Sequence, residues 1–173
     1  FNTIAKIKFS ESLLAQDLIA AAKFALLKED DLNLACLLKS PFFLVSEEKL
    51  LGFCLRKNEL ECSLYEALDD AKIKNSLDKI VKKSQALNSF EFFYYLIYQS
   101  GFDKNFIAYF NIQATTILNQ FLEVVSNFCE KNSGNLQHFL HFIETIDPQI
   151  SLNESSENAV RISTIHSAKG LQA

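Results

Sequence analysis

The sequence contains very little glycine or proline and no tryptophan or methionine. Only 4 glycines and 2 prolines occur among its 173 residues. A β-sandwich or β-barrel needs many turns, and these two residues are the ones that most often form turns. Because 49% of the residues are hydrophobic, the chain is also neither disordered nor fibrous. At this length we therefore expect one well-cored domain of the all-α class.

Cysteines are few and irregularly spaced, with no C-x-x-C pair; they are Cys36, Cys54, Cys62 and Cys129. This pattern predicts neither a disulfide framework nor a zinc site, and it is typical of a protein of the reducing cytoplasm. No uncharged apolar run approaches the roughly 20 residues that a membrane span requires. No basic segment followed by an apolar one marks a signal peptide.

The chain lacks a basic excess, because 17 basic residues stand against 21 acidic ones and the formal net charge is −4. A domain whose main role is to grip a phosphate backbone normally carries a basic stripe. Only Lys79, Lys82 and Lys83 form a small cluster. Any contact with nucleic acid is therefore expected to be local.

Helical periodicity accounts for most of the chain. Ser10 and Ser46 are predicted helix caps, and Ser40-Pro41 is predicted to end a helix, because the residue before proline avoids helical angles. Residues 4–9 alternate and predict a short strand or extended segment. The predicted helices cover residues 10–28, 30–39, 46–55, 62–70, 74–87, 90–98, 112–131 and 135–147.

Two predictions concern packing. The helix at 90–98 is apolar almost all round, which favours a central core helix over an aromatic platform for stacking bases. The helices at 112–131 and 135–147 are separated by Ser133-Gly134-Asn135, and we expect them to pack as an antiparallel hairpin.

The helical body contains no convincing catalytic group. His138 and His141 lie three apart, but a zinc site needs a third or fourth ligand. The carboxylate clusters at 29–31 and 69–70 are typical of helix ends, and neither has a further ligand at a fixed spacing. No nucleophile motif or glycine-rich phosphate loop occurs, so no metal site and no catalytic residue is predicted.

The C-terminal run VRISTIHSAKGLQA differs from the helices before it. An alternating segment, residues 160–164, leads to a cluster of hydroxyl, imidazole and ammonium groups followed by Gly170. Groups of this kind at a strand end suit phosphate or base contacts. By spacing alone, a frayed C-terminal tail explains the run equally well.

This run resembles motif V of UvrD-like superfamily-one helicases, T-[IVL]-H-x-[SA]-K-G-L-E, except that Gln172 replaces the usual glutamate. The stretch DLNLACLLKSPFFLVSEEKL, which follows a helix containing Asp17-Leu18, resembles a signature of AddA- and RecB-type helicase–nucleases. The segment 135–146 resembles the one that precedes motif V in the same proteins. Since some AddA-type members carry G-L-Q, that group matches best.

The resemblance implies a 2B-type helical insertion subdomain, with short extended segments at both ends that belong to an adjoining α/β motor domain. On this interpretation residues 1–9 lead in, 10–150 form the helical subdomain, 151–158 form a linker, and 159–173 begin motor domain 2A. The resemblance assigns DNA contacts to Thr164, His166 and Ser167. It places Lys169, Gly170 and Gln172 near the nucleotide.

The family also implies what the parent protein does. The parent is expected to be an ATP-dependent 3′–5′ DNA helicase with a nuclease, acting in double-strand break repair and recombination. It would use ATP and Mg²⁺ and work with an AddB-like partner subunit in the cytoplasm. The phosphate loop, Mg²⁺ ligands and arginine finger lie elsewhere in such proteins, so this chain is expected to be non-catalytic and to bind no cofactor, shaping the DNA path and regulating unwinding. The alternative is a helical protein–protein interaction module without a DNA role.

Overall fold

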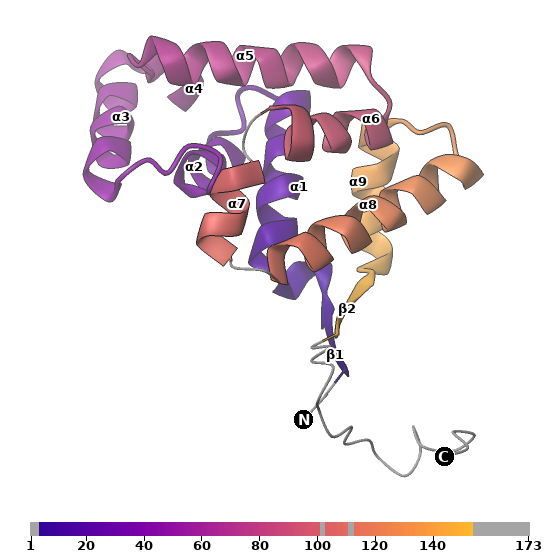
Figure 1. The fold of residues 1–173 in the computed structure, drawn as a ribbon. Coiled ribbons are helices and arrows are strands. Elements are labelled where there is room, and N and C mark those ends of the chain that lie inside the picture. Colours follow the sequence, from indigo (N-terminus) through magenta and orange to yellow (C-terminus); the bar gives the residue numbers. More distant parts are fainter. Residues whose placement is uncertain (1–3, 101–102, 111–112, 154–173) are drawn as a thin grey trace, which may run out of the picture.

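The structure of the chain is a computed structural model that describes residues 4–100, 103–110 and 113–153 (Figure 1). Within these residues the chain is all-α with short extended ends, which confirms the predicted fold class. The helices are α1 (Leu13–Leu26), α2 (Asp31–Lys39), α3 (Glu47–Leu60), α4 (Leu64–Ala67), α5 (Ala71–Ala86), α6 (Ser89–Tyr94), α7 (Asp103–Phe110), α8 (Gln113–Lys131) and α9 (Leu136–Ile146). A 3₁₀ turn, η1 (Phe9–Glu11), precedes α1, and a π-helix, η2 (Tyr95–Gln99), continues α6.

Short polar side chains begin most of these helices. Asp30, Ser46 and Asn88 each accept a hydrogen bond from a backbone N–H in the first turn, which satisfies donors that the helix itself cannot. The predicted cap Ser10 is wrong: Ser12 caps α1, because residues 9–11 form the 3₁₀ turn. Helix α7 was not predicted from the sequence.

Helix α1 lies at the centre of the molecule, with α2, α5, α8 and α9 packed around it (Figure 1). It is rich in alanine, and Ala15, Ala21 and Ala22 are fully buried. Such small side chains let neighbouring helices approach closely. This arrangement explains why α1 shows little polar surface along most of its length.

Phenylalanine rings join the elements that lie far apart in the sequence. The ring centroids of Phe9 and Phe121 are 5.1 Å apart and stacked, and those of Phe93 and Phe121 are 4.9 Å apart. Phe139 of α9 lies 5.3 Å from Phe128 and 5.4 Å from Phe93. Through these rings α9 packs on α8, but it crosses α8 rather than lying antiparallel beside it as predicted (Figure 1).

The aromatic helix at residues 90–98 is only partly a core helix. Phe92, Phe93, Leu96 and Ile97 are fully buried, as predicted, whereas Tyr94 and Tyr98 are 41% and 40% exposed. The prediction of burial on all sides is therefore wrong, because tyrosines on one face keep their rings and hydroxyls at the surface. The helix also changes from α6 to the π-helix η2 along its length.

Strands β1 (Ile4–Lys8) and β2 (Gln149–Asn153) form a two-stranded antiparallel sheet at one end of the helical body (Figure 1). The prediction of an extended segment at 4–9 is confirmed for residues 4–8. Strand β2 includes residues 151–153, where the sequence predicted the start of a linker. Residues 154–158 of that linker lie outside the described residues.

The phenylalanine contacts predict which substitution damages the fold. We expect Phe121→Ala to lower the free energy of unfolding by about 3 to 5 kcal/mol, because it removes a fully buried ring and leaves a cavity. Urea unfolding followed by circular dichroism measures the change. Leu32→Ala is the control, since Leu32 is 74% exposed; we expect a change within about 0.5 kcal/mol there. Equal effects at both sites would contradict the packing described.

Candidate functional site

The site residues predicted from the motif V resemblance all lie outside the described residues. They are Thr164, His166, Ser167, Lys169, Gly170 and Gln172. The described residues instead show how the two ends of the helical body are joined. They also show which of its polar side chains form hydrogen bonds or ion pairs. The attachment of the helical body is therefore the candidate site.

The attachment is the paired β1 and β2, which we call the stem. Its register pairs Lys6 with Ser151 and Ile7 with Ile150. The backbone N–H of Phe9 continues the ladder by donating to the carbonyl of Pro148 at 3.0 Å. Ile150 is fully buried and β2 packs against α8. The chain consequently enters and leaves the helical body at one point.

A side-chain contact locks the two ends at the base of the stem. Asp147 accepts hydrogen bonds from the Ser10 backbone N–H at 3.0 Å and from the Ser10 hydroxyl at 2.7 Å. These bonds lower the pKa of the Asp147 carboxyl, so it remains ionised and keeps accepting them. Asp147 ends α9 in the left-handed conformation, with φ 45°, which aspartate and asparagine tolerate better than most residues.

Two polar residues of the stretch DLNLACLLKSPFFLVSEEKL make structural contacts. The Asp31 carboxylate accepts a hydrogen bond from the Leu64 backbone N–H at 2.7 Å and pairs with Lys57 at 2.5 Å. Buried Ser40 donates to the Leu37 carbonyl at 2.7 Å and accepts from the Phe42 N–H at 3.3 Å. Ser40 thus stabilises the chain reversal after α2. Both side chains of this stretch are thus engaged in contacts that hold neighbouring segments together.

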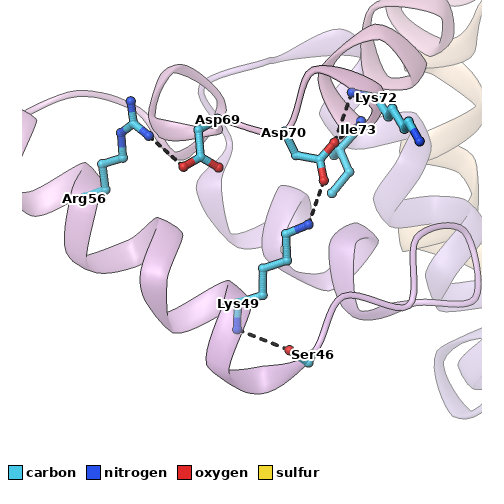
Figure 2. A network of polar contacts seen from close by, with 7 residues as sticks. All are labelled: Ser46, Lys49, Arg56, Asp69, Asp70, Lys72 and Ile73. Carbon is cyan, nitrogen blue, oxygen red and sulfur yellow. Dashed lines mark hydrogen bonds and ion pairs between the residues drawn. The ribbon is translucent and has the colours of Figure 1, made fainter.

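The carboxylates of Asp69 and Asp70 are engaged by α3 (Figure 2). The Arg56 guanidinium nitrogen Nη1 lies 2.8 Å from the Asp69 oxygen Oδ2, and the Lys49 nitrogen Nζ lies 2.6 Å from the Asp70 oxygen Oδ2. Asp70 also caps α5, and the Lys49 hydrogen bond is the main cause of its lowered pKa. Within the described ranges no three histidine, cysteine or acidic side chains are grouped to hold a metal ion. The helix-end interpretation of these carboxylates agrees with this geometry.

His138 and His141 both lie on the exposed side of α9. They line an apolar cavity of about 360 Å³ together with Phe128, Phe142 and Ile146. No third metal ligand joins them among the residues that the structure describes.

Asp17 is a carboxyl whose pKa is strongly raised by burial. It lies half-buried on α1, with no hydrogen bond or ion pair to another described residue. Burial raises its pKa from 3.8 to about 7, because a carboxylate is less well solvated there than in water. Sequence reasoning placed Asp17 within the resemblance but had no signal for this environment, since it depends on how the helices pack.

The chain was compared with protein-family models and with known proteins. No protein-family model matches the chain. The chain is similar to proteins named as subunits of a helicase/nuclease. One is the A subunit of the ATP-dependent helicase/nuclease of Thermoanaerobacter pseudethanolicus, 29% identical over 164 residues, covering 82% of this chain and 13% of the relative. The protein of the same name from Thermoanaerobacter sp. strain X514 matches with the same identity and coverage.

These comparisons support the helicase–nuclease class expected from the motifs. The chain spans only 13% of the length of these relatives, so their whole-protein activity does not transfer to it directly. None of the helices in the described part of the chain is long and apolar enough to cross a membrane.

The environment of Asp17 predicts a pH dependence of stability. Unfolded Asp17 loses its proton near pH 3.8 and folded Asp17 near pH 7, so stability falls as the pH rises between these values. We expect Asp17→Asn to raise the free energy of unfolding by about 1 kcal/mol at pH 8, after allowance for solvent screening, and to change it little at pH 4. Urea unfolding at both pH values measures this.

The control is Asp147→Asn, whose native pKa is lowered rather than raised. A lowered pKa contributes stability that is present at neutral pH and lost as the pH falls. Asp147→Asn should therefore destabilise the chain at pH 8 and have less effect in acid. The same sign of effect for both variants at pH 8 would contradict the environments described.

Proposed function

We propose that this chain is the helical 2B-type subdomain of an AddA-like helicase–nuclease subunit, together with the first residues of the returning 2A motor domain. The subdomain runs from residue 10 to about 150 and is non-catalytic. It shapes the path of DNA and regulates unwinding in a protein that acts in double-strand break repair and recombination.

The stem is the single observation that carries this proposal. A domain inserted into another must enter and leave at neighbouring points, and the 3.0 Å bond between Phe9 and Pro148 provides that geometry. The similarity to subunits of a helicase/nuclease over 82% of the chain supports the choice of host.

The remaining roles follow from the resemblance and belong to the parent protein. Thr164, His166 and Ser167 would lie along single-stranded DNA, and Lys169, Gly170 and Gln172 would lie near the nucleotide. ATP and Mg²⁺ would bind the parent through segments outside this chain. The proposed partners are DNA and an AddB-like subunit, and the cytoplasm is the proposed compartment.

The proposal predicts that the purified chain does not hydrolyse ATP, with or without DNA. ATP hydrolysis requires a phosphate loop, Mg²⁺ ligands and a positively charged finger acting together, and the sequence contains no phosphate loop. A coupled ATPase assay with single-stranded DNA measures this, with the parent protein as the positive control. Turnover that co-purifies with the chain through several columns and persists would overturn the proposal.

The stem allows a direct test of the insertion in the parent protein. Replacing residues 10–147 by Asn-Gly should join β1 to β2 as a tight hairpin, because Phe9 and Pro148 are already hydrogen-bonded neighbours. We expect the shortened parent to keep DNA-stimulated ATP hydrolysis within about tenfold and to unwind DNA at a changed rate.

The matched control removes residues 31–60 with the same Asn-Gly replacement. This deletion takes out fully buried Leu34, Leu37 and Leu38, so it should expose the core and reduce soluble yield. A shortened parent that folds but hydrolyses no ATP would contradict the insertion. Unchanged unwinding would instead favour the protein–protein interaction module.

A further inference from the structure

Three aromatic side chains form a row on the solvent side of α6 and η2. Phe90, Tyr94 and Tyr98 follow one another at intervals of four residues, with ring centroids 6.2 Å and 5.2 Å apart. Tyr94 and Tyr98 are 41% and 40% exposed, and Phe90 is half-buried. Exposed rings in a row offer faces on which the bases of a single strand can stack.

Hydrogen bonds fix the position of Tyr98 and of the π-helical turn. The Tyr98 hydroxyl donates a hydrogen bond to the Asn119 side-chain oxygen on α8 at 2.9 Å. The π-helical turn is closed by the Ser100 backbone N–H, which donates to the Tyr95 carbonyl at 2.9 Å. Short π-helical turns are uncommon and occur frequently at functional sites. The aromatic row is thus a positioned surface rather than a set of loose side chains.

A group of lysines lies on the neighbouring helix α5. Lys79, Lys82 and Lys83 are all exposed, and within the described residues none of the three takes part in an ion pair. The sole carboxylate of α5, Asp78, is engaged by Lys28 at 3.1 Å and by the Tyr65 hydroxyl at 2.6 Å. Asp78 also interacts electrostatically with Lys82. Lys79 and Lys83 are like charges one turn apart, which disfavours a helix, so an anion bound here would relieve this repulsion.

One of these lysines, Lys83, lies at the aromatic row. Lys83, Phe90 and Tyr94 line the same open cavity of about 240 Å³, and the Lys83 ammonium lies 5.1 Å from the centre of the Tyr95 ring. Glu91 also lines it, but its carboxylate accepts a hydrogen bond from the Asn88 backbone N–H at 3.2 Å as part of a helix cap. Figure 1 shows α6 directly beneath the end of α5.

We propose that this surface binds single-stranded nucleic acid, with bases stacked on Phe90, Tyr94 and Tyr98 and phosphates along Lys79, Lys82 and Lys83. The inference rests on the proposed function, which makes DNA the ligand of the parent. Aromatic faces beside ammonium groups match the two features of a single strand, its bases and its charged backbone. The chain has a net charge of −4, so a polyanion is expected to bind at a local group of lysines rather than over the whole surface.

The test measures binding of the purified chain to a fluorescently labelled 16-nucleotide oligothymidine by anisotropy. The double variant Tyr94→Ala/Tyr98→Ala should weaken binding by at least about tenfold, because each stacked base is lost. Tyr94→Phe/Tyr98→Phe should retain most of the affinity, because the rings remain. Tyr109→Ala is the matched control, since Tyr109 is 58% exposed on a different helix, α7.

The lysines are tested by the salt dependence of the same binding. Replacing Lys79, Lys82 and Lys83 by glutamine should reduce the slope of log affinity against log salt by about 2, because about 0.7 counterions are released per single-strand phosphate contact. Glutamine at exposed Lys6 and Lys131 is the control and should leave the slope unchanged. Circular dichroism checks that each variant remains helical.

Absence of oligonucleotide binding by the unaltered chain would overturn this inference, as would equal losses in the Tyr94→Ala/Tyr98→Ala and Tyr109→Ala variants. Either result leaves the insertion proposal standing if the shortened parent still hydrolyses ATP. Loss of ATP hydrolysis in that folded parent would reject the insertion whatever the oligonucleotide result. The two proposals can therefore fail separately.

Discussion

The pairing of the two ends of the helical body is the constraint on which the rest of the structure depends. Phe9 makes this connection twice: its backbone N–H bonds Pro148, and its ring stacks on Phe121. The first contact closes the stem and the second ties the stem to α8. Because Phe121 also contacts Phe93, the position of α6 follows from the same ring. A movement of the stem would thus be felt by α8 and α6 together.

Local chemistry made much of this fold predictable. The starts of α2 and α3 follow from short polar caps at Asp30 and Ser46, and the end of α2 follows from Ser40-Pro41. These signals act within a few residues, so the sequence displays them directly. The amphipathic pattern of α8 is equally local. The all-α class follows from the same local signals, combined with the scarcity of glycine and proline.

Contacts between residues far apart in the sequence could not be predicted from local patterns. Nothing local indicates that Asp31 bonds Leu64, that α9 crosses α8, or that residues 149–153 return to pair with 4–8. The raised pKa of Asp17 and the exposure of Tyr94 likewise depend on packing. Of the candidate site, the sequence located a motif at 164–172, which lies outside the described residues. The sequence also favoured a helix-end role for the carboxylates at 69–70, and Asp70 does cap α5.

The resemblance to helicase–nucleases and the proposed binding surface involve different residues of the chain. In the signature segment, Asp31 and Ser40 are occupied by contacts that hold helices together, so a recognisable sequence there reflects folding. Packing does not explain why the Tyr94 ring is exposed near Lys83, which makes no ion pair within the described part of the chain. Exposed rings and adjacent like charges cost solubility and helix stability when no ligand is bound. The family-like residues therefore support the proposed host, whereas the exposed aromatic residues, which packing does not explain, support the proposed contact with a single strand.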